Sequence, residues 1–333
     1  MILSVLDQST ASQGTSHDTA IRETLELARH CDALGYHRYW LSEHHNSGNI
    51  VGTAPEILMA AIAATTPRIR IGSAGVMLPH YSAFKVAEQF RVLEAIAPGR
   101  IDLGIGRAPG SDQLTSFALN PNPENVLDQF PRQVQELQHW VSGTPLPEGH
   151  PFSRVIAQPT GPTTPEIWIL GSSDYGAQLA AYFGLPYAFA YFFSEGRGVE
   201  EALDLYRKNY RPSEAHPRPV VTICVWALAA DTEEEALHQF KTRERAIVDR
   251  RQGIRQPLLP PEKAERPYSP EELIVAEKLN RRAIVGNAEQ VARRLKELAA
   301  RLELDELVIV TWTYDAAPRH RSYELIAHAF GLH

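Results

Sequence analysis

Cysteine is scarce in this sequence: only Cys31 and Cys224 occur among 333 residues. Two cysteines so far apart cannot supply the disulfide framework of a small secreted protein, so the sequence favours a reduced, cytoplasmic protein. Cys31 falls on the apolar face of a predicted helix, and Cys224 lies within an apolar run.

Long hydrophobic runs and blocks of like charge are also missing. No apolar run approaches the ~18 residues that suggest a membrane span. The segment MILSVLDQST has no basic region, and its apolar run is too short for a signal peptide. The formal net charge is −7, and no block of like charge is longer than Glu233-Glu234-Glu235. These absences argue against a membrane protein and against a nucleic-acid-binding protein.

Strand-like and helix-like segments alternate along the whole chain, whose composition is 44% hydrophobic and 22% charged. Predicted strands cover residues 2–6, 38–41, 69–74, 101–105, 167–170, 187–190, 220–229 and 307–311. Predicted helices cover residues 17–34, the segment after Pro55, and residues 84–96, 130–141, 176–183, 199–206, 232–249, 291–302 and 323–330. Repeated strand–helix units predict a parallel sheet, and eight of them predict an α/β fold, a closed (β/α)₈ TIM barrel, as one domain over residues 1–333. A doubly wound open sheet is the alternative.

Two segments exceed the minimal barrel, so insertions are expected after strands 4 and 7. The first, residues 107–129, is rich in proline, asparagine and glycine, and the second, residues 250–282, is rich in proline. Long loops of this kind are either functional lids or solvated insertions, and the sequence leaves both readings open.

Residues capable of chemistry gather where four predicted strands end, which is where barrel enzymes place their active sites. The second strand is followed by Glu43-His44-His45, and the third ends in GSAG at residues 72–75. The fourth ends in GIGRAPG at residues 104–110, and the fifth ends in LGSSDYG at residues 170–176, which opens a helix.

The LGSSDYG and GSAG segments each allow two interpretations. Small residues and hydroxyls at a strand-to-helix turn leave backbone N–H groups and the positive helix end free for a phosphate. On this segment alone, an ordinary N-cap from Ser172, Ser173 or Asp174 is the favoured explanation of the same turn. The small residues at 73–75 permit close approach of a ligand, or simple packing under a helix.

The GIGRAPG segment is rich in glycine but is not a dinucleotide fingerprint, because its third glycine is displaced and Pro109 intervenes. Its informative residue is Arg107, which can pair with a phosphate or with a loop carboxylate. Gly104 and Gly106 are expected to leave room inside the barrel for a flat ligand.

The paired histidines raise the question of a metal. Catalytic zinc needs about three protein ligands, and no further His or Cys falls at a strand end, so no metal is expected. A glycosidase needs two facing carboxylates, and the fourth strand offers none at its end. One histidine as an acid/base group in a pocket, with the other in a structural role, remains, beside the alternative of surface histidines.

Four ordered motifs resemble the bacterial luciferase-like monooxygenase family, and in particular its single-chain, alkanal-monooxygenase-like branch. The resemblance spans nearly the whole chain. It is carried by YHRYWLSEHHN (36–46), IGSAGVMLP (71–79), PGRIDLGIGRAPGSD (98–112), ILGSSDYGAQLAA (169–181) and the late VGNAEQV turn (285–291).

The resemblance implies a flavin-dependent monooxygenase that uses reduced FMN and O₂. A flavin hydroperoxide would oxidise a small organic substrate, for which an aldehyde is one option. His44 matches the family's main catalytic residue and Glu43 lies beside it. Ala74 and Gly75 match a non-proline cis peptide near the flavin ring.

The phosphate of the flavin is assigned in the same way. Arg107 and Ser172 match positions that hold it in the family. The helix-start argument adds Ser173, Tyr175 and Gly176 to these two. Luciferase has a reactive cysteine at the place of Gly106, so any tuning of the flavin by that thiol is absent here.

The resemblance also implies partners. A separate flavin reductase would supply reduced FMN. A homodimer would form through helices near residues 54–65 and 84–96, where an alanine-rich run (Ala60, Ala61, Ala63 and Ala64) allows close helix packing. Two other functions remain open: a non-catalytic flavin-binding protein, which the joint presence of Glu43, His44 and Arg107 disfavours, and a deazaflavin-dependent hydride-transfer oxidoreductase.

Overall fold

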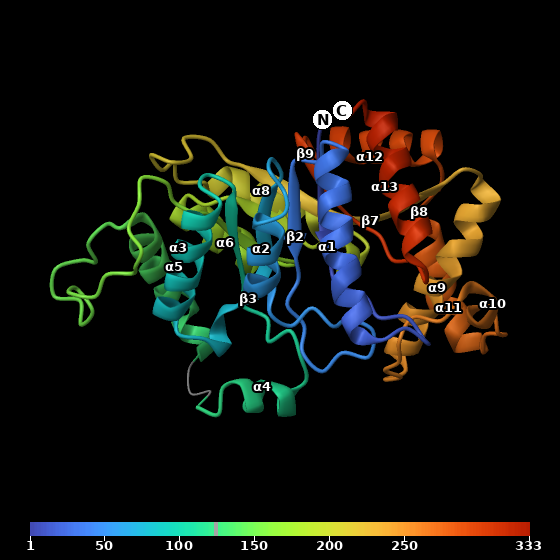
Figure 1. Cartoon of the computed structure of the whole chain (residues 1–333), viewed down its shortest axis with the longest axis horizontal. Coiled ribbons are helices and arrows are strands. Elements are labelled where there is room, and N and C mark those ends of the chain that lie inside the picture. Colours follow the sequence, from blue (N-terminus) through green and yellow to red (C-terminus); the bar gives the residue numbers. More distant parts are fainter. Residues whose placement is uncertain (123–125) are drawn as a thin grey trace.

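Eight parallel strands close into a barrel in the computed structural model, which describes residues 1–122 and 126–333 (Figure 1). Pairing of the last strand with both the first and the seventh closes the ring. The predicted (β/α)₈ barrel is therefore confirmed, and closure excludes the open doubly wound sheet. In ring order the strands are β1 (Ile2–Asp7), β2 (Arg38–Leu41), β3 (Arg70–Met77), β4 (Ile101–Gly106), β5 (Glu166–Gly171), β6 (Tyr187–Phe189), β7 (Val221–Ala230) and β9 (Glu306–Val310).

Each helix predicted from the sequence is present on the outside of the barrel. These are α1 (His17–Ala33), α2 (Pro55–Ala63), α3 (Ala83–Ile96), α5 (Val126–Ser142), α6 (Asp174–Phe183), α8 (Val199–Asn209), α9 (Glu233–Arg251), α12 (Ala288–Arg301) and α13 (Ala316–Phe330). Two short helices, η1 (Leu78–His80) and α7 (Tyr191–Ser194), follow β3 and β6. Within residues 1–122 and 126–333, no helix is both long and apolar enough to cross a bilayer.

Side chains alternate between two apolar clusters along the strands, as the two-residue period of a β-strand requires. In β7, Ile223 and Val225 join the large cluster between the sheet and the helices. Cys224 and Trp226, which alternate with them, join the cluster that fills the inside of the barrel. The apolar residues therefore form two cores, one outside the ring of strands and one inside it.

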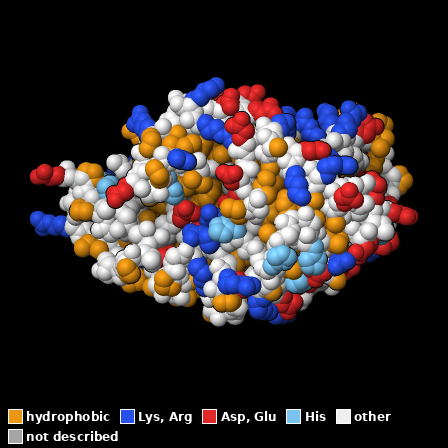
Figure 2. Space-filling view, turned by 90° about the horizontal axis from the view of Figure 1, so that it is seen from above, with side chains coloured by type: hydrophobic (Ala, Val, Ile, Leu, Met, Phe, Trp, Pro, Cys, Tyr) orange, Lys and Arg blue, Asp and Glu red, His pale blue; other side chains and the backbone are white. Residues whose placement is uncertain are grey.

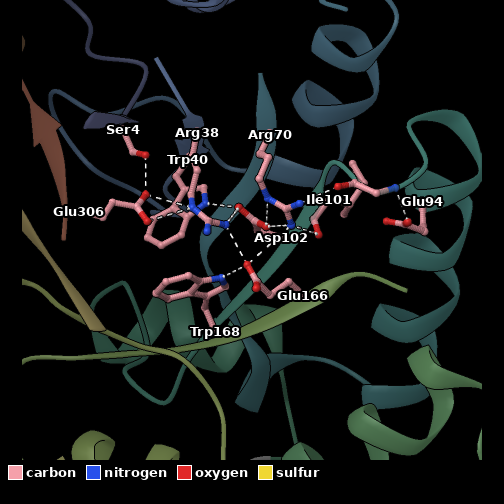
Figure 3. Close-up of polar contacts among 11 residues, drawn as sticks. Ser4, Arg38, Trp40, Arg70, Glu94, Ile101, Asp102, Glu166, Trp168 and Glu306 are labelled. Atoms are coloured by element: carbon pink, nitrogen blue, oxygen red, sulfur yellow. Dashed lines mark hydrogen bonds and ion pairs between the residues drawn. The ribbon is translucent and has the colours of Figure 1, made fainter. Parts of the chain in front are cut away.

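A buried ionic network fills the end of the barrel at which the strands begin (Figure 3). The guanidinium of Arg38 lies 2.9 Å from Asp102, 2.8 Å from Glu166 and 3.0 Å from Glu306. Arg70 pairs with Asp102 as well. These residues stand at the starts of β2, β3, β4, β5 and β9, so the network links five strands of the ring.

Two tryptophans complete the network from inside the barrel. The indole N–H of Trp40 donates to Asp102, and that of Trp168 donates to Glu166. The two arginines are important at this end of the barrel, because a buried carboxylate that loses its cationic partner destabilises the folded protein. Figure 2 looks onto the face that carries both chain termini in Figure 1, and there charges of both signs mix with apolar side chains.

The two insertions fall where they were expected but are not plain loops. After β4 the chain forms α4 (Gln113–Leu119), and residues 123–125 of this insertion lie outside the described residues. After β7 it forms α10 (Pro261–Ala264) and α11 (Pro270–Arg282). A ninth strand, β8 (Ile284–Asn287), then pairs with the second half of β7 outside the ring. Both insertions emerge at the carboxyl ends of the strands (Figure 1).

Removing the central cation of the network should destabilise the protein strongly. In the variant Arg38→Met, two buried carboxylates and the half-buried Glu166 lose their shared partner, and we expect the free energy of unfolding in urea to fall by about 3–5 kcal/mol. The matched control is Arg22→Met, whose exposed partner is Asp18; its change should stay within about 0.5 kcal/mol. Equal losses in the two variants would contradict the role given to Arg38.

Candidate functional site

Glu43, directly after β2, is a buried carboxylate whose oxygens are taken by protein donors. The hydroxyl of Tyr81 donates to it at 2.6 Å, and the Nε2–H of His45 at 2.8 Å. Its second oxygen accepts from the backbone N–H of Met77 at 3.1 Å. Burial, and then the Glu43 carboxylate, raise the pKa of Tyr81, which keeps the phenol protonated as a donor. Glu43 thus links the end of β2 to the end of β3 through hydrogen bonds, and His45 is part of this buried hydrogen-bond cluster.

His44 turns the other way, into the barrel mouth, and its protonation state follows from its neighbours. The indole N–H of Trp312 donates to Gln8 Oε1 at 3.0 Å. Because an indole can only donate, Gln8 must present its NH₂ group to His44, whose Nε2 lies 3.4 Å away. The Nε2 atom of His44 is therefore the acceptor, and the ring proton sits on Nδ1.

Burial also lowers the pKa of His44, while a hydrogen bond with the Gly110 backbone acts in the opposite direction. The nearby Arg250 guanidinium lowers the pKa further. Geometry and electrostatics agree on a neutral imidazole whose Nε2 lone pair accepts only the long, 3.4 Å hydrogen bond from Gln8. Such a group can accept a proton at neutral pH, which is what an acid/base residue must do.

Two cavities meet at His44. The first, of about 340 Å³, lies between the two insertions. The second, of only about 10 Å³, lies in the barrel mouth, and His44, Ile50 and Arg250 border both. The remaining lining of the second cavity comes from β7, from the helices α7 and α9, and from residues that follow β1 and β9: Gln8, Phe192, Phe193, Trp226, Arg243, Ile247 and Trp312.

An ion pair and several hydrogen bonds hold the second insertion in place beside the first cavity. Arg255 pairs with Asp112 of the first insertion at 3.0 Å and donates to the Asn46 carbonyl. Leu258 exchanges backbone hydrogen bonds with residues 11 and 13 beyond β1. A side chain at Gly48 would collide with the backbone of residues 255 and 256, so glycine is needed for this close contact. The insertions together form a roof over His44.

Arg107, at the end of β4, is an exposed cation without a carboxylate partner in the described part of the chain. Its Cζ atom lies 3.7 Å from the centre of the Tyr175 ring, which orients the guanidinium over the start of α6. At that start, Ser173 is the N-cap residue but makes no side-chain capping bond within the described residues. Ser172 and Ser173 are exposed, so this rim offers a cation, two hydroxyls and uncapped N–H groups.

Close packing explains Gly176 in the same turn. A Cβ atom there would come within 3.3 Å of the Tyr187 ring. A side chain at this position would therefore require the Tyr187 ring to shift slightly. The ordinary side-chain N-cap considered from the sequence is not what this turn uses.

The predicted site residues do not all meet in one place. Arg107 and Ser172 line neither of the two cavities that His44 borders. They stand at β4 and β5, across the ring from β9 and β1, which carry Trp312 and Gln8. The site consists of two halves of one barrel mouth rather than a single enclosed pocket.

The glycines of β3 and β4 agree only in part with the expectations from the sequence. The peptide bond between Ala74 and Gly75 is cis, as the resemblance implied. A Cβ at Gly106 would make only an ordinary 3.7 Å contact with Met77. A Cβ at Gly104 would collide with the carbonyl oxygen of Ser73, because the irregular stretch of β3 already fills that space. The expectation that Gly104 leaves room for a ligand is therefore wrong.

Sequence reasoning missed several residues of the mouth. Gln8, Trp312 and Arg243 were not singled out, although Gln8 directly follows β1 and Trp312 lies two residues after the end of β9. The rule that led to His44, attention to strand ends, would have found these two. Arg243 lies on α9 and carried no such signal. Within the described residues, no group of three or more His, Cys, Asp or Glu side chains is arranged to hold a metal ion.

A closed parallel barrel with polar and aromatic side chains at the carboxyl ends of its strands is the architecture of a (β/α)₈-barrel enzyme. The chain belongs to the luciferase-like monooxygenase family, whose model matches residues 1–305. The family resemblance noted from the four motifs is thereby confirmed.

Relatives match along almost the full length. The uncharacterised protein YwcH of Bacillus subtilis (strain 168) is 44% identical over 331 residues, which cover 98% of each chain. The N-acetyl-S-alkylcysteine monooxygenase of the same organism is 37% identical, and the match covers 98% of this chain and 97% of the relative. The solved structure of apo-MsnO8 is 36% identical with a TM-score of 0.90, covering 100% of this chain and 99% of that one.

More distant solved structures agree in fold alone. The oxygenating constituent of 3,6-diketocamphane monooxygenase from a Pseudomonas putida plasmid, in complex with FMN, is 19% identical with a TM-score of 0.71. It covers 98% of this chain and 96% of that one. An F420-dependent secondary alcohol dehydrogenase is 14% identical with a TM-score of 0.69, and the match covers 98% of both chains. The barrel thus serves proteins with either cofactor.

The state of His44 can be measured directly. In ¹⁵N-resolved NMR spectra, with the signal assigned through a His44→Gln variant, we expect the Nδ1–H tautomer. Because burial lowers the folded-state pKa below 6.5, less than half of His44 should be protonated at pH 6.5. Protonation should then become appreciable only as the pH falls further. An Nε2–H tautomer, or a midpoint above pH 6.5, would contradict the arrangement through Gln8.

Proposed function

We propose that this chain is an FMN-dependent monooxygenase that oxidises a small organic molecule with O₂, using reduced FMN from a separate flavin reductase. The main support is the position of the Arg107 guanidinium, which has no carboxylate partner within the described residues and lies beside the start of α6, where no side chain caps the helix. A phosphate needs such a set of donors. Family membership and the monooxygenase relatives support the type of reaction.

The residues fit an FMN phosphate. In this proposal Arg107 and Ser172 hold it, with Ser173, Tyr175 and Gly176 shaping the turn around it. Ala74 is half-buried and contacts the interior cluster, so the β3 end and the open side of Gly106 form a surface on which a flat ring can lie. Glu43 would act indirectly: its carboxylate accepts from the Met77 backbone N–H and so holds the end of β3 in place, instead of contacting the flavin itself.

Reduced FMN, when bound, supplies the electrons with which O₂ delivers one oxygen atom to the substrate and leaves the other as water. The chain contributes a proton acceptor at His44 Nε2, held in place by Gln8. Phe192, Phe193 and Trp312 present apolar surface to the same cavity, which favours exclusion of water. His44 is accordingly the proposed catalytic residue, and the other residues bind or position.

The substrate is proposed as a small organic molecule. The 37% identical relative is named for N-acetyl-S-alkylcysteines, so a thioether joins the aldehyde among the compounds to test. We also propose a homodimer through α2 and α3, where exposed Ile57, Val92 and Ile96 lie around a shared hollow. A monomeric mass in solution scattering would reject the dimer.

Arg107 should discriminate FMN from riboflavin, which lacks the phosphate. In Arg107→Met we expect the dissociation constant for FMN to rise about 10- to 100-fold, because charge-assisted hydrogen bonds are lost. Riboflavin affinity should not change. The matched control is Arg211→Met, since Arg211 is also exposed and stacked on a tyrosine, Tyr182, at 4.2 Å. An equal loss for both flavins would place the phosphate elsewhere.

Turnover tests the function itself. Purified protein is supplied with FMN, a flavin reductase, NADH and ¹⁸O₂, with N-acetyl-S-alkylcysteines and alkanals as substrates. We expect ¹⁸O in an oxidised product, and a loss of about 10²- to 10⁴-fold in His44→Gln, in line with general acid–base catalysis. Flavin binding without turnover would favour a flavin-binding protein. Anaerobic hydride transfer with a reduced deazaflavin, and none with FMN, would favour the deazaflavin enzyme.

A further inference from the structure

Asp112, near the start of the first insertion, joins three segments of the chain at the barrel mouth. Its carboxylate caps α4, because one oxygen accepts from the backbone N–H of Thr115 at 3.0 Å and the other accepts from the Thr115 hydroxyl at 3.0 Å. The second oxygen also accepts from the Asn46 amide at 3.1 Å and pairs with Arg255 at 3.0 Å. These contacts connect the first insertion to the loop after β2 and to the second insertion.

The contacts around Asp112 form a closed triangle. Arg255 donates to the Asn46 carbonyl at 3.2 Å as well as pairing with Asp112, so Asn46, Asp112 and Arg255 each contact the other two. Hydrogen bonds from the Thr115 backbone and from Arg255 lower the pKa of Asp112, which keeps the carboxylate ionised. An isolated exposed ion pair contributes little, but a network in which each member has two partners holds its members in one arrangement.

Gly110, two residues before Asp112, connects this triangle to the histidines. Its carbonyl accepts from the backbone N–H of His45 at 3.4 Å, and the Gly110 backbone also makes a hydrogen bond with the His44 ring. Gly110 has a φ of 60°, and a Cβ atom there would come within 3.0 Å of the Met77 side chain. A side chain at this position would be strained, so glycine allows the turn to lie directly against the residues that follow β2.

The His44 ring has few other polar partners to fix its orientation. Among the described side chains, Gln8 is its partner, through a long contact of 3.4 Å to Nε2. The proton on Nδ1 therefore depends on the Gly110 backbone for an acceptor, because the tautomer of a neutral imidazole is set by the hydrogen bonds that its two nitrogens make. If the Gly110 carbonyl moved away, the proton could transfer to Nε2, and that atom would no longer be a base.

We propose that Asp112 is a positioning residue for His44. Held by Asn46 and Arg255, it keeps the Gly110 carbonyl at the imidazole, so that the ring proton stays on Nδ1 and Nε2 can accept a proton from the reaction. This proposal rests on the proposed function, in which His44 is the proton acceptor. Because Arg255 belongs to the second insertion, the base is set only when both insertions are in place beside the cavity.

The tautomer of His44 in flavin-free protein tests the proposal. ¹⁵N-resolved NMR, at a pH where His44 is neutral, measures the ratio of the Nδ1–H form to the Nε2–H form. We expect the Nδ1–H form to dominate in the wild-type protein. In Asp112→Ala the ratio should fall at least about 5-fold, which corresponds to the loss of one ordinary hydrogen bond. A merely structural role for Asp112 would lower the stability of the protein and leave this ratio unchanged.

Milder variants separate the ion pair from the helix cap. Asp112→Asn keeps a good N-cap residue but loses the charge that pairs with Arg255, and Arg255→Met removes the same ion pair from the other side. Each should lower the tautomer ratio by less than Asp112→Ala does. The effects of the two should not add in the double variant, because both remove one interaction. Arg255→Lys, which keeps the cation, should retain most of the wild-type ratio.

Arg281→Met is the matched control. Arg281 also lies in the second insertion and loses an exposed ion pair, to Glu277 at 3.4 Å, so this variant should keep the wild-type ratio. The proposal is overturned if the Nε2–H form dominates in the wild-type protein, if folded Asp112→Ala keeps the wild-type ratio, or if Arg281→Met lowers the ratio equally. If Asp112→Ala does not fold, an unchanged ratio in both Asp112→Asn and Arg255→Met overturns it.

The two proposals fail separately. The tautomer is measured without flavin or turnover, so a ratio that falls in Asp112→Ala, in a protein without monooxygenase activity, would count against the reaction alone. An unchanged ratio beside normal ¹⁸O incorporation by the wild-type protein would count against the role of Asp112 alone. If both proposals hold, kcat in Asp112→Ala should fall in proportion to the fraction of the Nδ1–H form, while the dissociation constant for FMN stays unchanged.

Discussion

Closure of the parallel sheet between β9 and β1 is the constraint on which both ends of the barrel depend. At the amino ends of the strands, closure brings Glu306 of β9 to Arg38 of β2 and completes the ionic network. At the carboxyl ends, it brings Trp312 to Gln8, which come from opposite ends of the chain. The same pairing therefore stabilises the ring and orients the Gln8 amide toward His44. In barrels of this kind the amino ends of the strands contribute mainly to stability, and the carboxyl ends carry the residues for binding and chemistry.

The two adjacent histidines acquire different roles because the chain turns between them. His45 joins Glu43, Tyr81 and Met77 in a buried tie between β2 and β3. That tie engages the carboxylate of Glu43, which directly precedes His44, and the side-chain partner of His44 within the described residues is the uncharged amide of Gln8. A neutral base in the barrel mouth follows from this separation.

The sequence was sufficient for the ring but not for the fine structure of its insertions. All eight barrel strands were predicted because their apolar runs are strong and regularly separated by helices. The prolines at 261 and 270 were read as loop markers, yet each begins a helix, where proline is well tolerated. Ser269 and Glu272 even form a capping box. The strand β8 has only four residues, which is too short a pattern to recognise.

The site was predictable to the extent that its residues follow strands in recognisable motifs. His44, Arg107 and the turn at 172–176 were found in this way, although their roles remain proposals. The hydrogen bond between Gln8 and Trp312 joins residues 304 positions apart, and no local pattern can reveal it. The same holds for Arg243, whose guanidinium lies over the Trp226 ring and whose Nη1 finds no hydrogen-bond partner within the described residues. Such features depend on packing and emerge only in three dimensions.

The central claim is that one barrel mouth holds a phosphate at the β4–β5 rim and places a flavin ring within reach of the neutral His44. A crystal structure of the protein with FMN is the most direct measurement. The account predicts phosphate oxygens within hydrogen-bond distance of Arg107 and Ser172, with the ring over the Ala74–Gly75 peptide and facing His44. A phosphate bound at Arg243 or Arg250, or a ring outside the mouth, would contradict it.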